Sequence, residues 1–85
     1  MSLTVEWESA ARRALKKLQV DVAARVVEAV ADLAATGRGD VKKLTDSRPP
    51  AYRLCVGDWR VIFGRDTAAG ALLVHDVINR RDAYR

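Results

Sequence analysis

The fold is decided by one stretch of the chain, which reads Tyr52-Arg53-Leu54-Cys55-Val56-Gly57-Asp58-Trp59-Arg60-Val61-Ile62-Phe63. Two runs rich in aliphatic, β-branched and aromatic residues flank Gly57-Asp58, a two-residue loop typical of a β-hairpin. With this loop as the turn, Val56 pairs with Trp59 at the tip and Tyr52 pairs with Phe63 at the far end. The stretch therefore predicts an antiparallel hairpin with a defined register.

This register sorts the hairpin side chains onto two faces, because side chains alternate along a strand. We expect the core face to carry Tyr52, Leu54, Val56, Trp59, Val61 and Phe63. The opposite face carries Arg53, Cys55, Arg60 and Ile62. A simple two-layer domain leaves that second face open, so two guanidinium groups there predict a binding surface.

Length and composition limit what the chain can do. Its 85 residues predict one domain, residues 1–85, and 15 basic against 11 acidic residues give a net charge of +4, which favours an anionic partner. A single cysteine allows no internal disulfide, which fits a reducing cytoplasm, and a single histidine argues against a metal site. We recognise no signal peptide and no membrane-spanning run, so we expect a cytoplasmic protein with no membrane association.

The rest of the chain predicts an α+β domain in the order β-α-α-β-β-β. Residues 3–7 alternate like a half-buried strand, and two amphipathic helices follow, with Ser9 and Asp21 as N-caps and an end near Gly37. Residues 38–50 are polar and basic and predict a loop with a short strand near its middle. Two antiparallel helices are thus expected to pack on a small twisted antiparallel sheet.

The last strand is predicted at residues 71–78, which are nearly all apolar. The favoured register puts Leu73 and Val77 on the core face and packs His75 there as well. Its other face would then carry Leu72, Val74, Asp76 and Ile78 beside the hairpin arginines. An apolar strip of this kind is typical of a partner-binding site.

Four motifs occur in sequence along the chain: Lys43-Leu44, Tyr52-Arg53-Leu54, the hairpin from Val56 to Phe63, and Arg80-Arg81-Asp82-Ala83-Tyr84-Arg85. Together with the order of elements, they resemble the RelE/ParE superfamily of bacterial toxins, and specifically its RelE-like branch. The resemblance covers essentially the whole chain.

The resemblance implies a ribosome-dependent mRNA endoribonuclease, the toxin of a type II toxin-antitoxin pair, with a cognate antitoxin protein as its inhibitor. In such enzymes the 2′-hydroxyl attacks the adjacent phosphodiester and leaves a 2′,3′-cyclic phosphate and a 5′-hydroxyl, with no metal and no small-molecule cofactor. A base, an acid and cations at the phosphorane are required.

The resemblance also assigns site residues. Its catalytic positions correspond to Arg60, Arg80, Arg81 and Tyr84, and its RNA phosphate contacts correspond to Lys43, Arg53 and Arg85. A guanidinium fork suits phosphate oxygens. The terminal tyrosine would act as a base if neighbouring arginines favour its phenolate, and would otherwise stack on an RNA base.

Three residues depart from the family pattern. Cys55 and Asp76 stand where relatives commonly carry a basic residue, and Asn79 replaces a frequent histidine. Asp76 is expected opposite Arg60, where its carboxylate would compete with phosphate. Two alternatives therefore stay open: a ParE-like toxin that binds and poisons DNA gyrase without cutting RNA, and a degenerate member that only binds protein.

Overall fold

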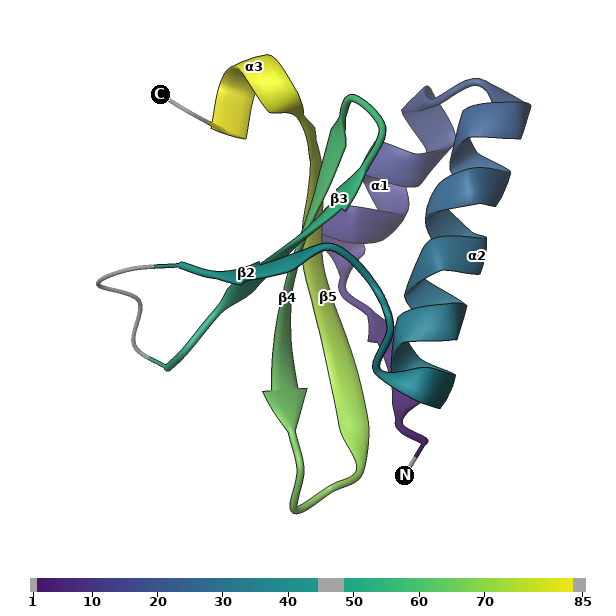
Figure 1. Cartoon of the computed structure of the whole chain (residues 1–85). Helices are drawn as coiled ribbons and strands as arrows, with labels where there is room; N and C mark the ends of the chain where they lie inside the picture. Colours follow the sequence, from purple (N-terminus) through teal and green to yellow (C-terminus); the bar gives the residue numbers. More distant parts are fainter. Residues whose placement is uncertain (1, 45–48, 84–85) are drawn as a thin grey trace.

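The chain forms a five-stranded sheet with two helices against one of its faces (Figure 1). The computed structural model describes residues 2–44 and 49–83. Its elements are β1 (Thr4–Trp7), α1 (Ser9–Lys17), α2 (Val20–Thr36), β2 (Val41–Lys43), β3 (Tyr52–Val56), β4 (Trp59–Asp66), β5 (Ala71–Asn79) and α3 (Arg80–Ala83). The predicted α+β fold is confirmed. None of the described helices is long and apolar enough to cross a bilayer.

The strands lie in the order β1-β5-β4-β3-β2, so the last strand of the chain is paired on both sides. The hairpin register is the predicted one, from Val56 opposite Trp59 to Tyr52 opposite Phe63. The sheet differs from the prediction in one detail, because β1 runs parallel to β5 and the sheet is therefore mixed. The connection from β1 to β5 contains both helices and strands β2 to β4, so it is long enough for the crossover that parallel strands need.

One hydrophobic core fills the space between the helices and the sheet. It combines Val26, Val30 and Leu33 of α2 with hairpin and β5 side chains. Leu54, Val61 and Phe63 are almost completely buried, and Tyr52, Val56 and Trp59 pack partly buried around them. The predicted core face of the hairpin is therefore confirmed, and its other face is left uncovered by α1 and α2 (Figure 1).

A β-bulge in β5 changes the expected face of several residues. Val74 pairs with Phe63 and Asp76 pairs with Ile62, so His75 is the extra residue of the bulge. A bulge places two residues opposite one and shifts the alternation that follows. Leu72 and Val74 therefore lie in the core, and the prediction that both lie on the open face is wrong.

The helix ends follow local backbone chemistry. Gly37 adopts a left-handed φ of 77° and its N–H donates to the Leu33 carbonyl at 2.8 Å, so α2 ends where predicted. The observed N-caps lie one and two residues before the predicted ones, Ser9 and Asp21. Ser9 and Val20 begin the helices, and the preceding Glu8 and Gln19 make no side-chain capping hydrogen bond.

The core position of Leu54 gives a stability prediction. Its side chain is 2% exposed, so Leu54→Ala should lower the free energy of unfolding by about 2–5 kcal/mol through lost burial and a residual cavity. Val20→Ala is the control, because Val20 is 87% exposed and should change the stability by less than about 0.5 kcal/mol. Urea unfolding followed by tryptophan fluorescence measures both. Equal midpoints for the two variants would contradict this description of the core.

Candidate functional site

The open face of the sheet carries a row of residues across four strands. Lys42 of β2 lies opposite Arg53 of β3, Arg53 lies opposite Ile62 of β4, and Ile62 lies opposite Asp76 of β5. Residues directly opposite each other project from the same face. Two cations, one apolar side chain and one carboxylate thus follow one another across the sheet.

A second row lies nearer the hairpin tip. Arg60 of β4 has Cys55 of β3 on one side and Ile78 of β5 on the other. The sequence expectation that Asp76 faces Arg60 is therefore wrong, because the bulge shifts the register of β5. Ile62 and Ile78 are half-buried on this face, so a short apolar strip does exist there, with a composition different from the predicted one.

Arg60 is tied to the turn beside it. Its Nη1 donates to the carbonyl oxygens of Gly57 at 2.8 Å and Trp59 at 2.9 Å, and the residue is only 8% exposed. Its Nε is buried and has no hydrogen-bond partner. The hydrogen bonds from a charged donor to these two carbonyls stabilise the tight turn. The Nε–H of the same guanidinium has no acceptor.

The short helix α3 begins beside the same turn. The Arg80 N–H donates to the Asp58 carbonyl at 2.7 Å, and the Arg81 N–H donates to the Asn79 side-chain oxygen at 3.1 Å. Asp58, Asn79, Arg80 and Arg81 line a hollow of about 250 Å³. Both arginines are exposed. Arg60 and Arg80 are thus hydrogen-bonded to the Gly57-Asp58 turn, with Arg81 next to them beside the hollow, and α3 lies on the side of the sheet away from α1 and α2 (Figure 1).

Two of the residues that depart from the family pattern have structural roles here. The Asp76 carboxylate accepts a hydrogen bond from the Val77 N–H at 2.8 Å, and no ion pair joins it to Arg60 within the described residues. The Asn79 side chain accepts from the Arg81 N–H and so caps the start of the helical turn. Cys55 is a free thiol of intermediate burial.

Some predicted site residues do not meet on the open face. Lys43 pairs with Tyr52, so its side chain projects from the face opposite to Arg53, and its neighbour Lys42 takes the open position. The predictions for Tyr84 and Arg85 lie outside the described residues. Arg53, Arg60, Arg80 and Arg81 are the predicted site residues that the described structure brings to one region.

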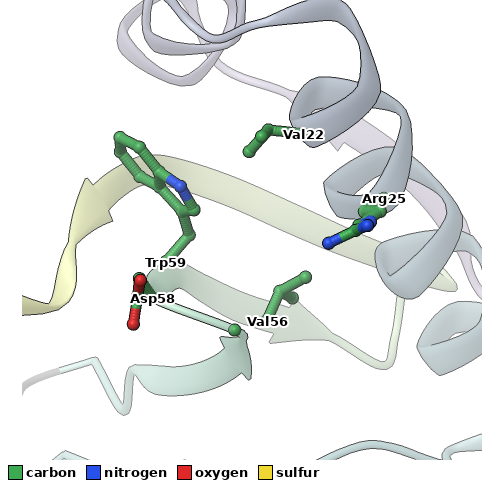
Figure 2. Close-up of a pocket in the computed structure, with 6 residues that line it drawn as sticks. Val22, Arg25, Val56, Asp58 and Trp59 are labelled. Carbon is green, nitrogen blue, oxygen red and sulfur yellow. The ribbon is translucent and has the colours of Figure 1, made fainter.

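Trp59 belongs to the other side of the hairpin. Figure 2 shows it beside a hollow of about 260 Å³ that lies between the hairpin tip and α2, with Val22 and Arg25 on the helix side and Val56 and Asp58 on the strand side. The side chain also packs against the core. Its predicted assignment to the core face is confirmed, and it is not part of the open face.

His75 is a site feature that the sequence interpretation missed. Its Nδ1 lies 2.6 Å from Glu8 Oε2, and both side chains are well exposed, at 38% and 50%. The prediction of a packed core histidine is wrong, because the bulge turns the residue out of the core. The available signal was the pair His75-Asp76, which interrupts an otherwise apolar strand. Within the described ranges 2–44 and 49–83, no group of three or more His, Cys, Asp or Glu residues is arranged to bind a metal.

A five-stranded sheet with two helices against one face, as in this chain, is also found in other small α+β proteins. The sequence matches no protein-family model and no curated protein. The toxin-antitoxin complex RelBE2 from Mycobacterium tuberculosis aligns structurally with a TM-score of 0.82 and 27% identity, over 94% of this chain and 93% of that chain.

Two further solved structures have the same fold. The archaeal RelE-RelB complex from Pyrococcus horikoshii OT3 has a TM-score of 0.79 and 24% identity, over 94% of this chain and 97% of that chain. A mutant of the E. coli toxin RelE in the free state has a TM-score of 0.68 and 13% identity, over 99% and 90%. The chain therefore has a RelE-like fold, as the sequence resemblance predicts.

The contacts of Arg60 predict a stabilising role that is separate from any chemistry. Arg60→Ala removes a charged donor from two carbonyls and should lower the free energy of unfolding by about 1–3 kcal/mol. Arg81→Ala removes the same charge from an exposed side chain and should change it by less than about 0.5 kcal/mol. Urea midpoints measure the difference, and an unchanged midpoint for Arg60→Ala would show that the guanidinium does not hold the turn.

Proposed function

We propose that this chain is the toxin of a type II toxin-antitoxin pair and acts as a ribosome-dependent mRNA endoribonuclease. The observation that carries the proposal is the group of arginines connected through the Gly57-Asp58 turn, on the open face of a RelE-like sheet. Guanidinium groups bind phosphate oxygens in a fixed planar geometry. Several of them on one uncovered face suit a substrate that is itself a chain of phosphates.

The arginines have different proposed roles in binding RNA, according to their exposure. Arg80 and Arg81 are exposed beside a hollow and can bind phosphates of the RNA backbone directly. Arg60 is held by the turn through its two Nη1 hydrogen bonds, so it supplies a fixed positive charge beside the bound RNA. Arg53, one row away on the same face, is a further phosphate-binding group. Tyr84 and Arg85 stay in the proposal as the base or stacking group and as a phosphate contact.

The same face supports an antitoxin as the protein partner. The solved neighbours from Mycobacterium tuberculosis and Pyrococcus horikoshii are complexes of a RelE-type toxin with its antitoxin. Half-buried Ile62 and Ile78 lie between basic residues on the open face. A segment with apolar and acidic side chains would cover both and exclude RNA. The proposed site of action is the bacterial cytoplasm, where messages are translated.

A second candidate function is a RelE-like protein that binds its antitoxin without cutting RNA. The burial of Arg60 and its two bonds to backbone carbonyls favour this candidate, because they reduce the donors available to a phosphate. The two candidates differ in one measurable property, which is cleavage of the message.

The test uses purified chain freed of antitoxin and ribosomes programmed with a defined message. We expect cuts inside the translated region with 5′-hydroxyl and 2′,3′-cyclic phosphate ends. Arg80→Ala should slow cleavage by about tenfold to a hundredfold, the loss of a charged hydrogen bond of about 1.5–3 kcal/mol. Arg38→Ala is the charge-matched control, since this exposed residue follows α2 and is outside the proposed site.

Three outcomes would contradict the proposal in different ways. An intact message with folded wild-type protein would favour the antitoxin-binding candidate. An uncut message together with inhibition of DNA supercoiling by purified gyrase would favour a gyrase-directed toxin. Equal slowing by Arg80→Ala and Arg38→Ala would mean that only overall charge matters.

A further inference from the structure

The Glu8-His75 pair on the open side of the bulge has no role in the function proposed above. Glu8 follows β1 and precedes α1, and its N–H donates to the Val74 carbonyl at 3.0 Å, so its backbone is fixed next to the bulge. The carboxylate then meets His75 Nδ1 at 2.6 Å. Residues 67 positions apart in sequence are thus joined at a defined point of the sheet.

Gly64 of β4 makes the space for the imidazole. A Cβ atom at this position would lie 3.0 Å from His75 Nε2, closer than ordinary side-chain contacts allow. The ring therefore lies over the bare backbone of β4, with Nε2 directed across the sheet and away from Glu8. Bulges often re-aim a side chain next to a functional site, and this one turns His75 and Asp76 outward together.

The carboxylate decides which ring nitrogen can accept a proton. Glu8 accepts a hydrogen bond, so in the neutral ring the proton belongs on Nδ1 and Nε2 is left with its lone pair. This arrangement, in which a carboxylate orients an imidazole and leaves the far nitrogen as the proton acceptor, is the one that general bases use. Two further carboxylates lie on this face near the ring: Asp76 of β5, which is directed to the Val77 N–H, and Glu6 of β1, which lies opposite Leu73. At this register β4 contributes only the uncharged Ile62 and Gly64.

The register places the imidazole on the same face as the Arg53 guanidinium. Arg53 lies opposite Ile62, the ring lies over Gly64 two residues farther along β4, and neighbouring strands are about 4.8 Å apart. A phosphodiester above β4 near Ile62 and Gly64 is within reach of the Arg53 guanidinium on one side and of the His75 imidazole on the other. This site is one row away from the Arg60 row.

We propose that His75 is the general base of RNA cleavage and that Glu8 is its positioning residue, with the reacting phosphate above Ile62 between His75 and Arg53. This assignment rests on the proposed ribonuclease function. His75 Nε2 takes the proton of the 2′-hydroxyl, the 2′-oxygen forms a bond to phosphorus, and the bond from phosphorus to the 5′-oxygen breaks. The 5′-oxygen leaves with a proton from solvent, and the imidazolium returns its proton to solvent, so protons and electrons balance.

The experiment compares wild type with His75→Gln, Glu8→Gln and the matched control Glu28→Gln in single-turnover cleavage of message on programmed ribosomes. His75→Gln should lower the rate at saturating protein by about a hundredfold or more, the usual contribution of a general base. It should also abolish the decrease in rate on the acid side of the pH profile. Glu8→Gln should lower the rate by a smaller factor. Its pH profile should still show the decrease in rate on the acid side, in an altered form. Glu28→Gln makes the same change as Glu8→Gln on the exposed face of α2, on the other side of the sheet, and should keep both the rate and the acid limb.

Circular dichroism and thermal unfolding establish that each variant is folded. A second variant, Gly64→Ala, leaves both groups of the pair in place but displaces the ring, and should slow cleavage without changing the affinity for ribosomes.

The outcomes separate this inference from the proposed function. If wild type leaves the message intact, the proposed ribonuclease function fails and the base assignment fails with it. If wild type cuts, and folded His75→Gln cuts at the same rate with the same acid limb, the assignment of His75 is overturned while the ribonuclease function stands. A loss in His75→Gln that appears only as weaker ribosome binding would also overturn the assignment, since a base acts on the chemical step.

Discussion

The backbone of the Gly57-Asp58 turn connects three parts of the molecule. The Gly57 carbonyl accepts from Arg60, and the Asp58 carbonyl accepts from the Arg80 N–H at the start of α3. Gly57 has a φ of 58°, a left-handed conformation that side chains other than glycine rarely adopt, so the tight reversal depends on this residue. Because the turn fixes the hairpin register, it also decides which residues share the open face with Arg53 and where the C-terminal arginines begin.

The hairpin was predictable because local and non-local signals agree there. A two-residue loop fixes the register from within, and strict alternation of apolar residues fixes it from the core side. The C-terminus of α2 was predictable for a similar reason, since Gly37 is a strong local signal. The alternation of residues 3–7 was enough to predict the first strand. Its parallel pairing with β5 depends on the path of the whole chain between the two strands, and no local sequence pattern indicates that path.

The fifth strand and the site were less predictable. Apolar residues occupy both odd-numbered and even-numbered positions of residues 71–78. The sequence therefore does not reveal the bulge at His75, after which the alternation of side chains between the two faces is reversed. Arg60 was recognised as a cation on the open face, but its rotamer depends on carbonyl groups that only the folded turn presents. Lys42 and Lys43 differ by a single register step, which sequence alone could not resolve. The assignment of Tyr84 as a site residue stays a prediction.

The pairing of β1 with β5 affects the timing of folding. Thr4 to Trp7 are synthesised before the helices and the hairpin, and their partners Ala71 to Val74 are synthesised after them. Contacts between such distant segments form late, because the loop between them must first be closed. On a translating ribosome β1 therefore stays unpaired until β5 is made, after the helices and the hairpin have emerged. The row of residues from Arg53 to Asp76 needs β5 as well, so the open face is assembled only when synthesis of the sheet is complete.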